Sequence, residues 1–243
     1  MAKSAFRQAL EDAIELRHSA VHPWSEAWTS GKLNRGQLAE WVKQHFHYVS
    51  HFAEWVAAVY ANCPHPDVQH FLLENVTEEE GLVGMHGAAP VRHSDLLLEF
   101  GEVCGKSRQE ILNAQINGEL LPETLGLQSW CTVQSRKPFV EALSGLLIGL
   151  ESQVPRIYSK TTPPLLEKYG FSEEEVTFFT IHIAADIEHG EKGYEIVEKF
   201  ATSDEQRAAC VRNVREATMM RRLYLDGVWR TFVEKPAAQK LAA

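Results

Sequence analysis

Residues 178–193 read FFTIHIAADIEHGEKG and combine a helical apolar pattern with three side chains of the metal-ligand type. At 100° per residue, His182, Asp186 and His189 share an arc of about 60° on one face of a helix. Apolar residues such as Phe179 surround the triplet, so we expect little of this helix to face solvent. Buried ionisable groups are costly unless they are paired or bind a metal ion. The stretch therefore favours a metal site over the alternative, a solvated polar stripe.

The rest of the chain repeats the helical pattern. Apolar residues recur at three- and four-residue spacing, without sustained period-two alternation. Capping boxes mark four helix starts, at Asn34–Gln37, Ser107–Glu110, Ser172–Glu175 and Ser203–Gln206. The predicted helices span about 3–19, 35–62, 66–80, 92–104, 107–115, 137–160, 172–200 and 203–232, with Pro163–Pro164 in a connection. The pattern predicts an all-α bundle of about seven to eight helices.

The composition limits the class of protein. The chain has 243 residues, 44% of them apolar, and a net charge of −9 from 33 acidic and 24 basic residues. We predict one helical domain at 1–235 and a frayed tail at 236–243. The acidic balance argues against nucleic acid as a partner. No apolar run reaches the roughly 18 residues of a membrane span, and no secretory signal pattern is present, so we predict a cytoplasmic protein that does not bind membranes.

Two other segments supply candidate ligands. Glu151 follows the apolar run 142–150, which has the pattern of a central helix; an exposed helix end is the alternative. The acidic run 78–80 closes an amphipathic helix, and His86 and His93 follow it in a glycine-broken stretch. A solvated acidic face is the alternative for this run. Together, three helical segments offer two glutamates, one aspartate and three histidines that can meet at one interior point.

That set of side chains suits a pair of first-row transition metal ions. Mixed imidazole and carboxylate ligands favour iron, manganese or zinc over calcium or magnesium. Three carboxylates would offset most of the charge of two divalent ions. The ferritin-like arrangement fits poorly, because the sequence has one Glu-x-x-His unit, Glu15–His18. A zinc protease also fits poorly, because the sequence has no His-Glu-x-x-His.

Residues 22–64, HPWSEAWTSGKLNRGQLAEWVKQHFHYVSHFAEWVAAVYANCP, resemble the first two helices of the haem-oxygenase-like superfamily. This superfamily includes thiaminase II and protein C of pyrroloquinoline-quinone (PQQ) synthesis, and the resemblance runs from near Glu15 to about Trp229. It is sharper with the di-iron branch, whose pattern is a glutamate, a histidine, a second glutamate and His-x-x-x-Asp-x-x-His. The residues that the resemblance implies as metal ligands are Glu79, His93, Glu151, His182, Asp186 and His189.

The chain departs from the family pattern in two places. More residues separate Glu79 from His93 than in close relatives, so His86 is an alternative ligand to His93. The self-sacrificing para-aminobenzoate synthases consume a tyrosine of their own near the first helix connection. This chain has Ser25 there, and a leucine instead of a tyrosine precedes Glu151, so that branch is disfavoured.

The resemblance implies an O2-dependent oxidoreductase with two iron ions, as Fe(II) or Fe(III), or with manganese in place of iron. Its substrate would be a small carboxylate, an amino acid derivative or a fatty acid. The reaction would be N-oxygenation, desaturation or oxidative C–C cleavage in a biosynthetic pathway. Candidate substrate contacts are Arg156, Arg221, Arg222, His47, Tyr48 and His51. We also expect an external electron donor and a homodimer.

Three other functions stay open. A cofactor-independent oxidase like PQQ-synthesis protein C would need a basic, anion-binding pocket where this chain offers a metal site. A thiaminase would need a cysteine nucleophile, for which Cys131 is the candidate. A metal-free binding or regulatory bundle would use the triplet of residues 182, 186 and 189 as a polar core network, and it would take up no iron.

Overall fold

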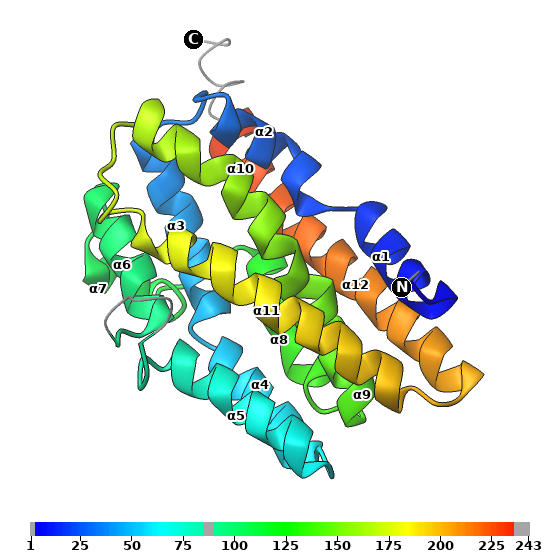
Figure 1. The fold of residues 1–243 in the computed structure, drawn as a ribbon. Helices are drawn as coiled ribbons and strands as arrows, with labels where there is room; N and C mark the ends of the chain where they lie inside the picture. The colour runs from blue at the N-terminus through cyan, green and yellow to red at the C-terminus, as the bar shows by residue number, and fades with distance from the viewer. Residues whose placement is uncertain (1–2, 85–89, 236–243) are drawn as a thin grey trace.

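The computed structural model describes residues 3–84 and 90–235, and within these ranges the regular structure is entirely helical (Figure 1). The all-α prediction is confirmed for this part of the chain. The predicted tail at 236–243 and the alternative ligand His86 lie outside the described residues. No helix in the two described ranges is both long enough and apolar enough to cross a membrane.

The chain forms more and shorter helices than predicted. The α-helices are α1 (Ala5–Glu15), α2 (Pro23–Thr29), α3 (Arg35–Val49), α4 (Phe52–Asn62), α5 (Pro66–Glu79), α6 (His93–Val103), α7 (Arg108–Asn113), α8 (Pro122–Gln134), α9 (Phe139–Leu143), α10 (Val154–Glu167), α11 (Thr177–Phe200) and α12 (Asp204–Trp229). The tighter 3₁₀ turns are η1 (Ser19–Val21) and η3 (Glu151–Gln153), and the wider π turns are η2 (Ser144–Leu150) and η4 (Arg230–Glu234).

Three of the four predicted capping boxes start helices. Asn34, Ser107 and Ser203 each accept a hydrogen bond from the backbone three residues on, and the side chain at that position bonds back. Ser172 and Glu175 form the same reciprocal bonds, of 2.8 and 3.2 Å, but they close a turn, and α11 begins at Thr177. The predicted hydrogen bonds therefore form at Ser172, but the predicted helix start at this position is wrong.

The remaining differences have local causes. α2 and α8 are absent from the predicted helices, although both begin with proline at the first helical position, where its missing N–H is harmless. The predicted helix 35–62 is divided into two helices after Val49. Ser50 is the C-cap residue of α3, and His51 is the N-cap residue of α4. The predicted helix 137–160 divides into α9, η2, η3 and α10. α10 continues through both prolines to Glu167, where it packs against α2 and α11.

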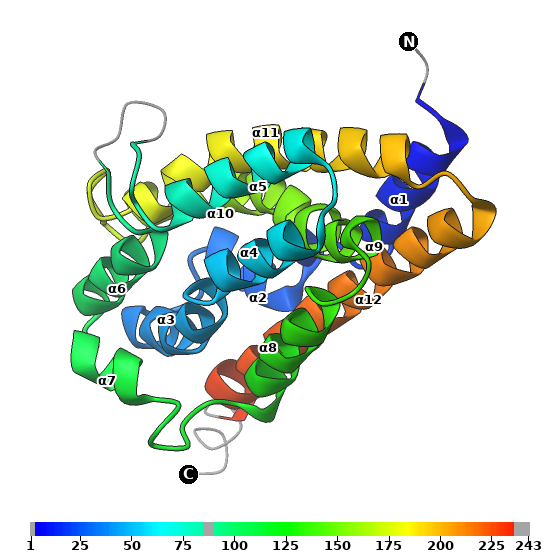
Figure 2. The same ribbon diagram turned by 90° about the horizontal axis from the view of Figure 1, so that it is seen from below.

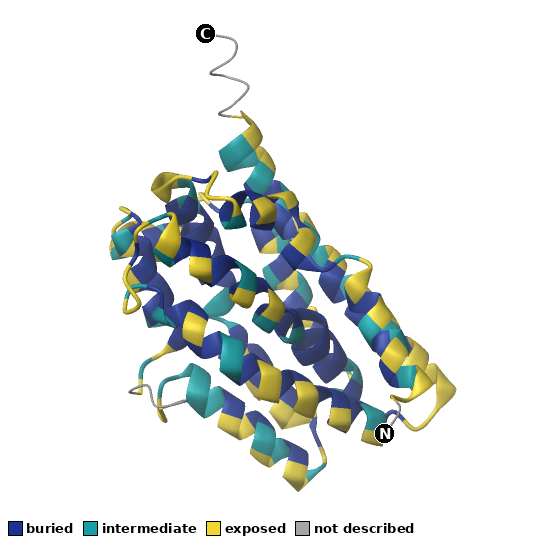
Figure 3. Ribbon diagram, turned by 45° about the horizontal axis from the view of Figure 1, so that its top comes forward, coloured by how far each residue is buried: buried dark blue, intermediate teal, exposed yellow. Residues whose placement is uncertain are grey.

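The π segment η2 lies at the centre of the molecule. All seven of its residues are buried, and it contacts α12, α11, α9 and α8. Figures 1 and 2 show α11 running across the bundle with α5 alongside it, while buried residues gather on the central helices in Figure 3. The acidic residue Glu151 directly follows η2 and is only 4% exposed. The fold therefore places the buried carboxylate of Glu151 at the end of the apolar segment η2.

Glycines allow this close central packing. A Cβ atom at Gly149 would lie 2.4 Å from the Cβ of Ala217 in α12, and one at Gly145 would lie 2.3 Å from the Nε2 of Gln134 in α8. Neither gap admits a methyl group without movement of a neighbour. The approach of η2 to α12 and α8 therefore depends on these two glycines.

Replacing Gly149 with alanine should push η2 away from α12. We expect Gly149→Ala to lower the free energy of unfolding by about 1–3 kcal/mol, the usual cost of overpacking a core. Gly126→Ala is the matched control, because the nearest atom to its new Cβ would be the Met220 Cε at 3.6 Å. The control should keep or raise stability, since alanine favours a helix. Urea denaturation measures both, and equal stabilities would contradict the packing argument.

Candidate metal centre

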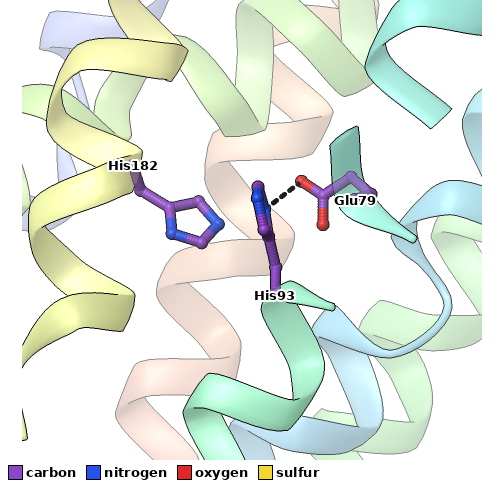
Figure 4. Close-up of side chains that lie close together, drawn as sticks. All are labelled: Glu79, His93 and His182. Carbon is purple, nitrogen blue, oxygen red and sulfur yellow. Dashed lines mark ion pairs between the residues drawn. The ribbon is translucent and has the colours of Figure 1, made fainter. Parts of the chain in front are cut away.

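The first cluster joins three helices. Glu79 is the last residue of α5, His93 is the first residue of α6, and His182 lies in the first half of α11. The Nδ1 of His93 lies 3.2 Å from the Oε1 of Glu79, and the rings of His93 and His182 are 4.5 Å apart. Figure 4 shows the three side chains pointing toward one another. One ligand-type atom from each lies within 4.8 Å of the others.

The second cluster joins η3 to the same long helix. The Nδ1 of His189 lies 3.0 Å from the Oε1 of Glu151 and 3.9 Å from the Oδ1 of Asp186. Again one atom from each residue lies within 4.8 Å of the others. Both clusters also border a single cavity, since Glu79, Glu151, His182 and Asp186 all line it. The predicted face of α11 thus contributes to two adjacent clusters.

Charge and burial compete in the first cluster. Burial by itself would raise the pKa of Glu79, but the neighbouring His93 outweighs burial and holds that pKa at about 2. Burial would lower the pKa of His93, but Glu79 raises it above its ordinary value. The pKa of His182 falls to about 4, first because the ring is buried and then because His93 lies beside it. Glu79 is thus anionic and His182 neutral near pH 7.

The second cluster concentrates negative charge. Burial raises the pKa of Asp186 well above its usual range, and the neighbouring Glu151 raises it further. Burial would lower the pKa of His189, but its hydrogen bond to Glu151 and the nearby carboxylates raise it to about 11. Like charges this close cannot all ionise without a compensating cation. In the bare protein, protons supply that compensation.

Several polar atoms of the clusters lack hydrogen-bond partners. These atoms are His93 Nδ1, Glu151 Oε2 and Asp186 Oδ2, all of them buried. The His93 Nδ1 lies close to Glu79, but the contact does not have the geometry of a hydrogen bond. An unpaired buried polar atom costs about 1–3 kcal/mol. Coordination to a metal ion would satisfy each of these atoms, so the donor set fits first-row metal ions.

Hydrogen bonds orient two of the imidazoles. The Nδ1–H of His182 donates to the carbonyl oxygen of Phe178 at 2.5 Å, which leaves Nε2 free for a metal ion. The Nε2 of His189 lies 2.9 Å from the Oε2 of Glu78, so Nδ1 faces Glu151 and Asp186. A carboxylate on the far nitrogen of a histidine is the usual way to fix the ring of a metal ligand.

Asn75 and Glu78, which are not among the predicted site residues, also contact the second cluster. The Nδ2 of Asn75 lies 3.1 Å from the Nδ1 of His189 and 3.4 Å from the Oε1 of Glu151. Asn75 is fully buried, and its Oδ1 has no partner. The sequence could have indicated this, because Asn75 lies three residues before Glu78 and four before Glu79, a spacing that places them on one helix face.

Of the predicted substrate contacts, Tyr48 and Arg221 line the cavity at the two clusters. His47 points the other way, and its Nε2 lies 2.8 Å from the carbonyl oxygen of Ile111. The side chain of His51 is 37% exposed and lies 3.2 Å from Glu54. Neither His47 nor His51 lines the cavity at the two clusters.

The other predicted arginines also lie away from this cavity. Arg156 is half-exposed, and its Nη1 donates to Glu15 at 2.7 Å. Arg222 is partly exposed on α12 and does not line the cavity, whereas its neighbour Arg221 does. Cys131 is fully buried, and burial raises the pKa of its thiol well above the usual range. That environment disfavours the thiolate that a thiaminase would need.

Two relatives with assigned activities cover most of this chain. A 4-aminobenzoate synthase from Nitrosomonas europaea is 30% identical to this chain, covering 96% of this chain and 94% of its own length. A pyrroloquinoline-quinone synthase from Cronobacter sakazakii is 26% identical, covering 70% of this chain and 65% of that protein.

Solved structures show the same fold. A TenA homologue from Pseudomonas syringae superposes with a TM-score of 0.78 at 16% identity, covering 93% of each chain. A domain from Shewanella denitrificans with a heme oxygenase-like fold has a TM-score of 0.70 at 18% identity, covering 93% of this chain and 90% of the other. The predicted haem-oxygenase-like fold is confirmed. The sequence profile of a family described as iron-containing redox enzymes matches residues 39–222, and this chain belongs to that family.

Proposed function

We propose that this chain is a non-haem enzyme that binds two iron ions, one at each cluster, and uses O2 to oxidise a small carboxylate-bearing substrate. The observation that carries the proposal is the pair of buried His/carboxylate clusters bordering one cavity. The bound iron would supply the electrons that O2 chemistry requires. The six proposed ligands are Glu79, His93 and His182 at the first cluster, and Glu151, Asp186 and His189 at the second.

The residues around the clusters suit oxidative chemistry. Phe52, Val154 and Phe178 give the cavity apolar walls that exclude water. Burial raises the pKa of Tyr48 and Tyr158 above the ordinary value, so both phenols keep their protons and can donate hydrogen bonds. The three carboxylates of the clusters would offset most of the charge of two divalent ions. We also propose an external electron donor, because repeated turnover must return the metal to its reduced state.

Formation of 4-aminobenzoate is a second candidate, which rests on the name of the 30% identical relative. Ser25 argued against the self-sacrificing branch, since that branch needs a tyrosine of the protein itself. Three buried tyrosines from other helices nevertheless border the cavities here: Tyr48, Tyr158 and Tyr224. If the candidate is correct, the Cα–Cβ bond of one tyrosine breaks, the ring and its benzylic carbon leave as 4-aminobenzoate, O2 oxidises that carbon to the carboxylate, and an amine of the protein replaces the phenol oxygen, which leaves as water. Protein supplied with Fe(II), O2 and a reductant should then release 4-aminobenzoate and lose mass from one tyrosine. Peptide mass spectrometry decides this, and unmodified tyrosines would exclude it.

Each cluster should hold its own metal ion. We expect wild-type protein reconstituted with Fe(II) under anaerobic conditions to bind about two iron atoms per chain. Glu79→Gln and Glu151→Gln should each reduce the content toward one, because each removes a charged ligand from a different cluster. Glu74→Gln is the matched control on α5, since its exposed carboxylate pairs only with His70 at the surface among the described residues. Elemental analysis after desalting measures the content.

A different pattern of iron content would change the proposal. Two iron atoms in both cluster variants would show that the clusters are not the binding sites. One atom per chain in wild type would leave a mononuclear site. No uptake by wild type would favour the metal-free bundle.

The reduced protein should react with O2. We expect an O2 pulse to the anaerobic Fe(II) protein to consume O2 in proportion to bound iron, with a transient change in visible absorption. In Glu151→Gln and His189→Ala, consumption should fall at least about tenfold, because the second cluster is incomplete. Glu74→Gln should match wild type. Consumption that followed free Fe(II) in solution and ignored these substitutions would contradict the proposed function.

A further inference from the structure

A second cavity lies beside the first and has a different character. Its aromatic and aliphatic walls define it as the aromatic chamber: Trp24, Trp28, Trp41, Ile157, Tyr224 and Leu225. The chamber shares three residues with the metal-side cavity, namely His45, Tyr158 and Arg221. The centre of a water molecule could occupy a volume of about 30 Å³ in the chamber and about 40 Å³ in the metal-side cavity. These volumes limit any occupant to a small molecule.

Arg221 stands where the two cavities meet and lacks a counter-ion. It is only 6% exposed. Within the part of the chain that the structure describes, its guanidinium forms one hydrogen bond, from Nη1 to the Leu150 carbonyl oxygen at 3.0 Å, and no ion pair. A buried charge without an opposite partner is costly. The remaining N–H groups suit the fork of donors that a carboxylate accepts.

The chamber contains a second unsatisfied group. The hydroxyl of Ser19 lines it, is 1% exposed and has no hydrogen-bond partner. Its neighbour Ser25, by contrast, donates to the Ser19 carbonyl oxygen at 2.8 Å. A hydroxyl left unpaired in the interior costs free energy unless a ligand or a water molecule bonds to it. The chamber therefore offers a cation and a free hydroxyl within apolar walls.

The charge around the chamber favours an anion there. Burial lowers the pKa of His45 well below its usual range, and Arg221 lowers it further, so the ring is neutral. Burial likewise raises the pKa of Tyr158 and Tyr224, which keep their protons. Arg221 is then the one charged group among the chamber's lining residues, all of which the structure describes. Arg221 also lines the metal-side cavity, but there the carboxyl groups Glu79, Glu151 and Asp186 join it, so in the metal-free protein an anion is favoured more in the chamber.

We propose that the aromatic chamber is a binding site for a small carboxylate with a flat apolar body. The carboxylate binds Arg221 where the cavities meet, the Ser19 hydroxyl supplies a further polar contact, and the tryptophans pack against the body. Flat apolar bodies suit these walls because aromatic rings gain from stacked and edge-to-face contacts. The ligand's role as substrate rests on the proposed function, but its binding requires no metal.

Binding to metal-free protein tests the site, with benzoate as the probe and benzamide as its uncharged counterpart. We expect calorimetry on chelator-treated wild-type protein to show benzoate binding at least about tenfold more tightly than benzamide, because bonds to charged groups are the stronger ones. Arg221→Met should abolish this preference, while the adjacent and partly exposed Arg222→Met keeps it. Equal affinities in wild type would overturn the proposal even if Arg221→Met failed to fold.

Two substitutions on α10 locate the ligand. Ile157 lines the chamber and Val154 lines the metal-side cavity, one turn apart and both 7% exposed. Ile157→Phe should weaken benzoate binding at least about tenfold by filling the chamber, whereas Val154→Leu should leave it nearly unchanged. The reverse result would place the ligand on the metal side and overturn the proposal.

The outcome is separable from that of the proposed function. Selective benzoate binding in a protein that takes up no iron would support the chamber and remove the redox function. Iron uptake without a preference for benzoate over benzamide would support the redox function and overturn the proposed binding site in the chamber.

Discussion

The burial of three carboxylates and three imidazoles around one cavity is the constraint on which the rest of this structure depends. Groups of this kind are stable in an interior only when opposite charges, protons or metal ions compensate them. The protein alone compensates them incompletely, since His93, Glu151 and Asp186 each keep an unpaired atom. The surrounding helices must therefore hold six costly side chains in place. Their own packing, in which η2 against α12 is the most extensive contact, must supply the required stability.

The sequence predicted the ligand-type residues better than it predicted the helices that carry them. His182, Asp186 and His189 could be placed together because helical periodicity fixes their directions within a single element. Glu79, His93 and Glu151 needed the family resemblance, since no local rule says which helices meet. The structure brings all six together in two clusters. Their role as metal ligands remains a prediction.

The errors in the prediction also have physical causes. α2 has only seven residues, and only four of the 13 residues of α8 are buried, so neither helix has a strong apolar periodicity in its sequence. His47 lies about 100° around α3 from the cavity-lining Tyr48 and contacts the Ile111 carbonyl oxygen, while His51 lies in the turn between α3 and α4. The π geometry of η2 cannot be read from an apolar run, because its sequence suits an α-helix equally well. Such wide turns often occur next to functional sites.

The C-terminal five residues of α5, 75–79, contribute to both clusters. Glu79 pairs with His93 in the first, while its neighbours Glu78 and Asn75 contact His189 in the second. Because the three side chains share one short rigid segment, a displacement that improves one cluster must alter the other. Occupation of either cluster should therefore change the affinity of its neighbour, and by thermodynamic linkage the effect is equal in both directions. Metal binding at the two clusters would then be cooperative. Whether the cooperativity is positive or negative would depend on how α5 shifts against α11.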